Sequence, residues 1–326
     1  MSQTGLFDLS DRQEQLSRKG DPLERLNEVI DWEDFRPLLK KVRPKPGPQG
    51  GRPPYDGVLL FKMLALASLY GLSDEQLEYQ VKDRLSFMRF LGLDLQDRVP
   101  DATTIWLFRE ALGKKSGLLD KLFQRFERHL RKAGYEARGG QIIDASIVEV
   151  PTLRGKPDDD HGPRSRQQDR DAKWTKKHGR SYFGYKNHIS IDRRHKLIRQ
   201  SAVTDASVHD SRAMDLVLDP DNAGSQVWAD SAYRSAETED WLAEQDYRSR
   251  VHHRAWRNRP LTARQRDQNR TRSRIRARVE HVFGHQVQAM GMKVIRTIGH
   301  RRVRTKIMLN NLVYNMSRYR FLVSQA

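Results

Sequence analysis

The sequence contains no cysteine and no long apolar run. Without cysteine the 326-residue chain can form neither disulfides nor thiolate metal sites, so any metal would need oxygen or imidazole ligands. The longest apolar run, VLLFKMLALASLYGL, is short and interrupted by Lys62, and the first residues lack the basic start and apolar core of a signal peptide. The sequence therefore predicts a cytoplasmic protein without membrane contact, long enough for about two domains.

Acidic residues are scarce relative to basic ones. Lys and Arg number 60 against 42 Asp and Glu, which gives a formal net charge of +18 and a sequence pI near 10.2. Twelve arginines and a single acid, Asp267, lie between Tyr247 and Val279. Because neutralising nucleic-acid phosphates releases condensed counterions, this excess favours a polyanionic partner, with nucleic acid foremost. The alternative is a basic protein whose charge serves solubility alone.

The first half of the chain has the pattern of a helical domain, expected over residues 1–137. Residues 22–41, 58–70 and 118–133 have helical character. Ser73 followed by Gln76 predicts a capping box, and Asp101 predicts a further N-cap. The short helices and turns suit helix-turn-helix packing and DNA binding or dimerisation, although such a bundle is also compatible with a simple folding unit.

The second half, residues 138–326, alternates β-branched runs with helical segments. Strands are expected in QIIDASIVEV, SYFGYKNHISID, HKLIRQSAVTDA and SQVWAD, with a short one at 248–252, and helices at 210–218, 235–244, 272–290 and 301–322. This order predicts an α+β chain whose second domain has a mixed α/β sheet, compatible with a ribonuclease H-like fold. Residues 154–177, with a DDDH cluster interpreted as solvated, are expected to form a surface loop, and residues 248–272 a basic loop.

Two aspartates lie where charge is costly. Asp144 lies within the apolar run QIIDASIVEV and Asp230 ends QVWAD, and a buried carboxylate needs a cation or a partner. A third carboxylate, Glu280, lies beside the apolar face of an expected helix. Together they would suit two Mg²⁺ or Mn²⁺ ions roughly 4 Å apart, the arrangement used in phosphoryl transfer. The alternatives are an arginine partner for Asp144, a turn cap at Asp230 and a surface pair between Arg276 and Glu280.

Several ordered blocks give the chain a family resemblance. GRPPYDGVLLFKMLALASLYGLSDEQLE, VPDATTIWLFRE, IIDASIVEVP, WTKKHGRSYFGYKNHISID, TDASVHDS, WADSAYRS and RARVEHVFG resemble, in this order, those of bacterial DDE transposases of the insertion sequence five family. The resemblance implies an RNase H-like catalytic domain, Asp144, Asp230 and Glu280 as catalytic metal ligands, and transposition dependent on two Mg²⁺ ions, for which Mn²⁺ substitutes. The chain departs from the family pattern at Ala232 for glycine, Ser273 for tyrosine and Val287 for lysine.

The expected partner is double-stranded DNA, both at transposon ends and at the target, bound by a homodimer or a larger oligomer. A Trp in a basic loop is more often a simple packing residue, and stacking on a displaced base is the alternative for Trp256. Two other functions stay open: an inactive relative that only binds DNA, and a metal-dependent nuclease without strand transfer. The expected DNA contacts are Arg276, Arg272, Arg254, Arg257, Trp256, Lys186, His188 and Lys293.

Overall fold

The computed structural model describes residues 8–42, 53–152, 168–177, 179–222 and 224–325. The chain divides into two compact units, one of Met1–Arg125 with Met316–Ala326 and the other of Phe126–Asn315. The dividing point lies within a helix, twelve residues before the expected boundary at 137, and the last turns of the chain join the first unit.

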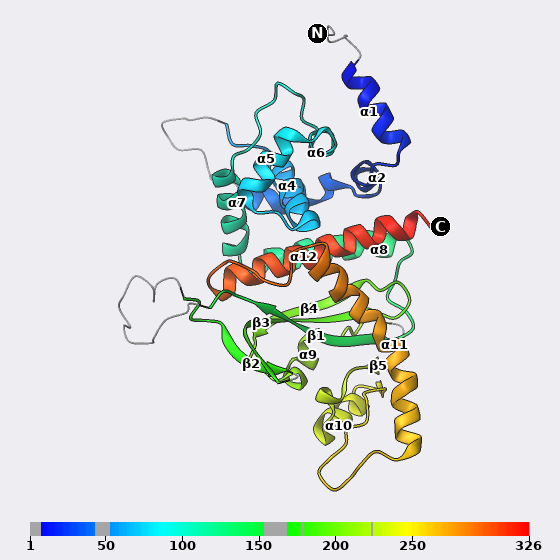
Figure 1. The fold of residues 1–326 in the computed structure, drawn as a ribbon. Helices are drawn as coiled ribbons and strands as arrows, with labels where there is room; N and C mark the ends of the chain where they lie inside the picture. The colour runs from blue at the N-terminus through cyan, green and yellow to red at the C-terminus, as the bar shows by residue number, and fades with distance from the viewer. Residues whose placement is uncertain (1–7, 43–52, 153–167, 178, 223, 326) are drawn as a thin grey trace. The chain divides into compact units, whose positions relative to one another are not determined.

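The first unit is helical, as predicted (Figure 1). Ser73 and Gln76 form the expected capping box, Asp101 accepts a hydrogen bond from the Thr104 amide, and Gly71 ends a helix at φ 61°. These signals divide the sequence into short helices, as the turn-rich pattern indicates. The elements are α1 (Asp8–Arg18), α2 (Pro22–Val29), η1 (Trp32–Phe35), α3 (Arg36–Leu39), η2 (Lys40–Val42), α4 (Gly57–Tyr70), α5 (Asp74–Asp83), α6 (Leu85–Leu91), α7 (Ala102–Lys114) and the start of α8 (Leu118–Lys132).

Aromatic side chains form the centre of this unit. The rings of Trp32, Phe35, Phe61 and Phe90 pack with centroids 5.1 to 6.4 Å apart. In the described part of the chain no single helix is long and apolar enough to cross a membrane. Helices α4 and α5 satisfy that test only together, across a bend of 102°.

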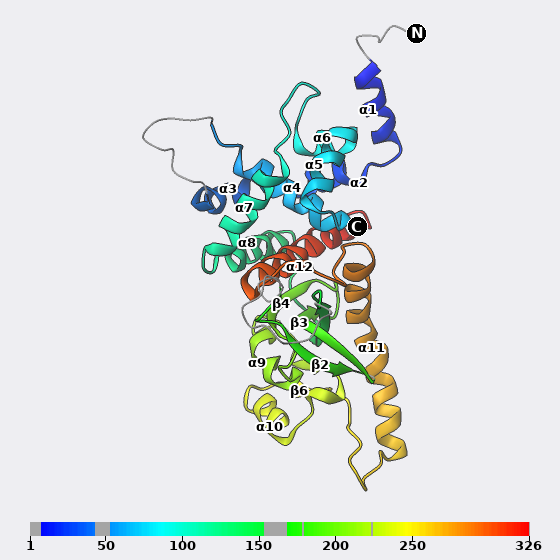
Figure 2. The ribbon, with the colours of Figure 1, turned by 60° about the vertical axis from the view of Figure 1, so that its left-hand side comes forward.

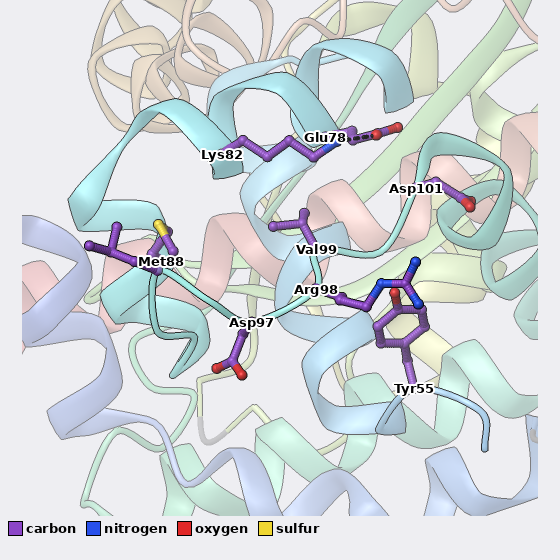
Figure 3. A pocket seen from close by; sticks show the side chains of 9 residues that line it. Tyr55, Glu78, Lys82, Met88, Asp97, Arg98, Val99 and Asp101 are labelled. Carbon is purple, nitrogen blue, oxygen red and sulfur yellow. Dashed lines mark hydrogen bonds and ion pairs between the residues drawn. The ribbon is translucent and has the colours of Figure 1, made fainter. Parts of the chain in front are cut away.

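A hollow of about 440 Å³ lies beside α5 in the first unit (Figure 3). Its charged groups are of mixed sign. Glu78 accepts hydrogen bonds from Lys82 at 2.6 Å and from the Ala102 amide at 2.8 Å, which ties α5 to the start of α7. The hollow is lined by Tyr55, Glu78, Lys82, Met88, Leu95, Asp97, Arg98, Val99 and Asp101.

The second unit contains a six-stranded mixed sheet. Strand β3 pairs antiparallel with β1, β2 and β4, whereas β1 pairs parallel with β5, and β5 parallel with β6. The path is β2–β3–β1–β5–β6, and β4 lies on β3. The strands are β1 (Gln141–Glu149), β2 (Lys173–Lys177), β3 (Arg180–Asp192), β4 (Ile198–Asp205), β5 (Gln226–Trp228) and β6 (Arg248–Ser249).

Helices cover both faces of this sheet (Figure 2). Ile143 packs with residues of α9 (Met214–Val217) and α10 (Ala236–Glu244), while Val148 packs with residues around the start of α12 (His300–Val323). Successive side chains of a strand point to opposite faces, so Asp144 shares the face of Val148. This face also carries α11 (Ala263–Gln288), which contacts β1 and β5.

Two sequence predictions are wrong in part. Residues 173–177, expected in a surface loop, form β2, while the DDDH cluster at 158–161 lies outside the described residues. Residues 263–272, expected in the basic loop, are the first turns of α11. That helix begins early because Thr262 and Gln265 form a capping box and because arginine is a good helix former.

Candidate active site

The two aspartates lie at the same level of neighbouring parallel strands. The β1–β5 register pairs Ile142 with Trp228, and Asp144 and Asp230 each follow two residues later. Strand β5 ends at Trp228, whereas β1 continues past Asp144 to Glu149, so both carboxylates lie where β5 ends, beside the middle of β1. Asp230 also caps η5 (Ser231–Tyr233) by accepting a hydrogen bond from the Ala232 amide. The turn-capping alternative therefore describes part of what Asp230 does.

Helix α11 carries Glu280, which is linked to Asp144 by Arg276. Val279 and Val282 are buried against the sheet, which turns Arg276 and Glu280 to the margin of the helix. Arg276 Nη1 lies 2.9 Å from Asp144 Oδ2, and Arg276 Nη2 lies 3.2 Å from Glu280 Oε1. The surface pair on the helix therefore exists, and the same guanidinium also bridges to the strand.

The three carboxylates line one cleft of about 520 Å³. One wall is α11, the floor is β1, and the other wall belongs to the β2–β3 hairpin. Three carboxylates and two cations therefore share one concave site, where a charged substrate or ion would meet side chains of both signs. The lining residues are Asp144, Ala145, Ser146, Ile147, Lys177, Tyr182, Asp230, Arg276, Glu280 and Phe283.

Burial dominates the electrostatics of Asp144. It raises the pKa of this carboxyl from its ordinary value of 3.8 to about 6, although Arg276, the Ala145 amide and Lys177 act in the opposite direction. The negative charge of Asp230 raises this pKa further. Only 15% of the Asp144 side chain is exposed, against 61% of Glu280. Asp144 is thus the member of the three that most needs a cation nearby.

Tyr233 is a buried residue three positions after Asp230. Its side chain is 1% exposed, and its hydroxyl has no hydrogen-bond partner among the described residues. Burial raises the pKa of Tyr233 well above its ordinary value, and the charges of Asp144, Asp210 and Asp230 add to this effect. The hydroxyl is therefore a neutral donor close to the carboxylates.

The carboxylates do not form a ready ligand set. Across the described ranges, no three His, Cys, Asp or Glu side chains lie close enough together to hold a metal ion. Arg276 occupies the position of a cation between Asp144 and Glu280. The donors at the cleft suit a divalent metal in chemistry and location, but Glu280 would have to exchange its arginine partner for the ion.

Five of the expected DNA contacts are basic or aromatic residues near α11 and its flanking loops. Arg254, Arg257 and Lys293 are exposed, and Trp256 is 58% exposed with the Arg254 guanidinium 5.0 Å from its ring. Arg272 differs, because its guanidinium is half-buried and donates a hydrogen bond to the Val251 carbonyl. None of these residues lines the cleft.

Lys186 and His188 are placed differently from expectation. Both are buried, at 9% and 0% exposure. The Lys186 ammonium bonds Asp210 at 2.8 Å, and His188 Nε2 lies 2.9 Å from the Thr204 hydroxyl. Burial lowers the pKa of His188 to about 4, so the ring is neutral near pH 7. In these positions neither side chain reaches the surface, so a DNA contact by either would require this face of β3 to open.

Sequence reasoning missed Lys177 and Tyr182, which line the cleft opposite α11. The available signal was that Lys173, Thr175 and Lys177 are all polar and two residues apart, as on one face of a strand. The segment lacks the apolar residues that usually identify a strand, so its charge suggested a loop.

Two transposase families match parts of the chain. Residues 136–316 match the family described as "Transposase DDE domain", and residues 10–111 match "Transposase domain (DUF772)". No solved structure matches the chain.

Proposed function

The chain belongs to the DDE transposase family, and on that premise we propose that it cuts and joins the ends of an insertion sequence of the insertion sequence five type. Asp144, Asp230 and Glu280 are its catalytic carboxylates in this proposal. The observation that carries it is the placement of both aspartates two residues beyond the Ile142–Trp228 pair, in the cleft that Glu280 also lines.

The sheet supports an RNase H-like core for the second unit. With β2 set aside, the strand order is β4–β3–β1–β5–β6, in which three antiparallel strands adjoin two that run parallel to β1. The first aspartate lies on the central strand β1 and the second directly after its parallel neighbour. This arrangement is the one that the sequence resemblance implies.

Divalent metal ions are general to this family, and we propose Mg²⁺, with Mn²⁺ as a substitute, held as two ions by Asp144, Asp230 and Glu280. Oxygen ligands of this kind suit these ions. The chemistry that two such ions supply when bound is activation of the attacking oxygen and stabilisation of the leaving oxygen. The Tyr233 hydroxyl is buried and has no hydrogen-bond partner among the described residues, and the charges of Asp144 and Asp230 act on it.

The basic residues of the second unit then hold DNA. Arg276 exchanges Glu280 for a backbone phosphate, while Arg254 and Arg257 contact phosphates from the exposed loop and Trp256 stacks on a base. Arg272 donates a hydrogen bond to the Val251 carbonyl and so supports this loop, and Lys293 contacts DNA from the exposed segment after α11. Because two element ends must be joined together, we propose a homodimer or larger oligomer on DNA.

A cleavage assay tests the proposal. Labelled element-end DNA and a target plasmid are incubated with the protein in Mg²⁺ or EDTA, for the wild type, Glu280→Gln and Asp267→Asn. Asp267 is an exposed acid on the same helix, outside the cleft, and serves as the matched control. Metal-dependent cutting and joining should disappear in Glu280→Gln and persist in Asp267→Asn.

Three other outcomes would contradict parts of the proposal. Undiminished cutting by Glu280→Gln would remove Glu280 from the catalytic set. Binding of end DNA without cutting would identify a DNA-binding relative that has lost catalysis. Cutting without joining would identify a nuclease.

A further inference from the structure

Two cations face each other across the β2–β3 hairpin. Lys177 pairs directly with Arg180 in the antiparallel register, so both side chains lie on the same face. Both are exposed, and neither forms an ion pair with any described residue. Like charges placed directly opposite each other destabilise a sheet. The protein alone therefore contains an uncompensated repulsion at this point.

The same face of the hairpin lines the cleft. Thr175 pairs with Tyr182, two residues along from Lys177 and Arg180, and side chains two apart on a strand share a face. Tyr182 and Lys177 both line the cleft. The intervening Lys176 therefore points to the opposite face of the hairpin, as does Trp174, whose ring packs 5.2 Å from that of Phe183. Lys176 and Lys177 thus carry the same charge but point to opposite faces of the hairpin.

The hairpin faces the catalytic groups across this cleft. Arg276 and Glu280 line it from α11, and Asp144 and Asp230 line it from the sheet. Lys177 lines this cleft together with Asp144, so its ammonium belongs to the same concave site as the carboxylates. An anion that enters between the two walls would therefore meet positive charge on both sides.

We propose that Lys177 and Arg180 form a second DNA-binding wall of the active-site cleft, which contacts backbone phosphates on the side opposite α11. The inference rests on the proposed function, because it takes DNA as the substrate. The β-carbons of a cross-strand pair lie about 5 Å apart, so both flexible side chains can reach one phosphate or two successive ones. A phosphate between them replaces the repulsion by two charge-assisted hydrogen bonds.

The test compares Lys177→Gln with Lys176→Gln, which removes the same charge from the opposite face. Binding to a mixed-sequence fluorescent duplex is measured by anisotropy in EDTA, so that no cutting occurs. Loss of one phosphate contact should reduce the steepness of log affinity against log salt by about 0.9. The loss of affinity relative to the wild type should therefore be roughly 3.5-fold larger at about 50 mM than at about 200 mM salt. Lys176→Gln should keep the wild-type slope, and Lys177→Arg should restore it.

A second measurement does not depend on DNA. Because Lys177→Gln removes the cross-strand repulsion, its thermal midpoint without DNA should be at or above that of the wild type. Equal slopes for Lys177→Gln and Lys176→Gln, in a wild type that binds and cuts DNA, would overturn this inference and leave the proposed function standing. A wild type that does not bind the duplex would overturn both.

Discussion

Asparagine at position 144 should make the metal-free protein more stable while abolishing its chemistry. Burial raises the pKa of Asp144 from 3.8 to about 6 even with Arg276 beside it. Because each pKa unit corresponds to about 1.4 kcal/mol, the ionised carboxylate lowers the free energy of unfolding by about 3 kcal/mol at about pH 8. Asparagine keeps the acceptor for the Ala145 amide without the charge, so most of this loss should be recovered.

The effect should depend on pH with a definite sign. The folded pKa is the higher one, so between 3.8 and about 6 the folded state holds a proton that the unfolded chain has released. The contribution of Asp144 to stability therefore falls as pH rises through this window. The gain in free energy of unfolding of Asp144→Asn over the wild type should be about half its full size at about pH 5 and complete at about pH 8.

Urea unfolding in EDTA at these two pH values measures the difference. Glu280→Gln is the control, because its side chain is 61% exposed and its loss should change stability by no more than about 0.5 kcal/mol. Added Mg²⁺ should stabilise the wild type more than Asp144→Asn, since the ion binds the folded carboxylates. If Asp144→Asn were less stable than the wild type at about pH 8, the Arg276 pairing would outweigh the burial and the reasoning would be refuted.

Three further predictions concern buried groups of the second unit. Arg199→Met leaves the fully buried Asp192 without its guanidinium partner, so the free energy of unfolding measured with urea should fall by at least about 3 kcal/mol. The control Arg138→Met breaks an exposed pair and should lower it by under about 1 kcal/mol. Burial lowers the pKa of His188 to about 4, so stability should fall as pH falls below about 6.5, and His188→Gln should reduce the loss between about pH 8 and pH 5 by about 2 kcal/mol. Asn311→Ala removes the partner of two buried amides and should cost about 2 kcal/mol by the same measurement.

Local signals predicted most elements of the fold. The capping box at Ser73 and the N-cap at Asp101 fixed helix starts in the first unit, and the β-branched runs around Asp144 and Val227 identified strands. These signals work because each depends on neighbouring residues. The Thr262–Gln265 capping box is a signal of the same kind, but the surrounding run of arginines favoured the prediction of a basic loop.

Strand β2 could not be predicted in the same way. Four of its five residues are exposed, so it has no buried face and no apolar alternation. It exists because its backbone pairs with β3 from Lys173–Gly184 to Lys177–Arg180. Such a strand depends on pairing with the next strand of its hairpin and has no apolar pattern of its own. The cleft residue Lys177 was missed for the same reason.

The candidate site was predictable as a set of residues but not as an arrangement. Buried context selected Asp144 and Asp230, because a carboxylate in an apolar strand needs compensation. The identity of the compensating group depends on how α11 packs. The amides of Asn187, Gln286 and Asn311 form a buried cluster that joins β3, α11 and α12, and such long-range pairs cannot be read from spacing.

Arg276 explains why a site with three carboxylates is stable before any substrate or ion arrives. Its pair with Glu280 is an exposed i,i+4 contact, a type worth only a few tenths of a kcal/mol. Its pair with Asp144 is shorter and buried, and breaking it would leave a charge with little solvent. An incoming cation or phosphate therefore separates Arg276 from Glu280 more easily than from Asp144. Glu280 is thus the carboxylate expected to change partner first, while Arg276 keeps Asp144 ionised until the ligand set is complete.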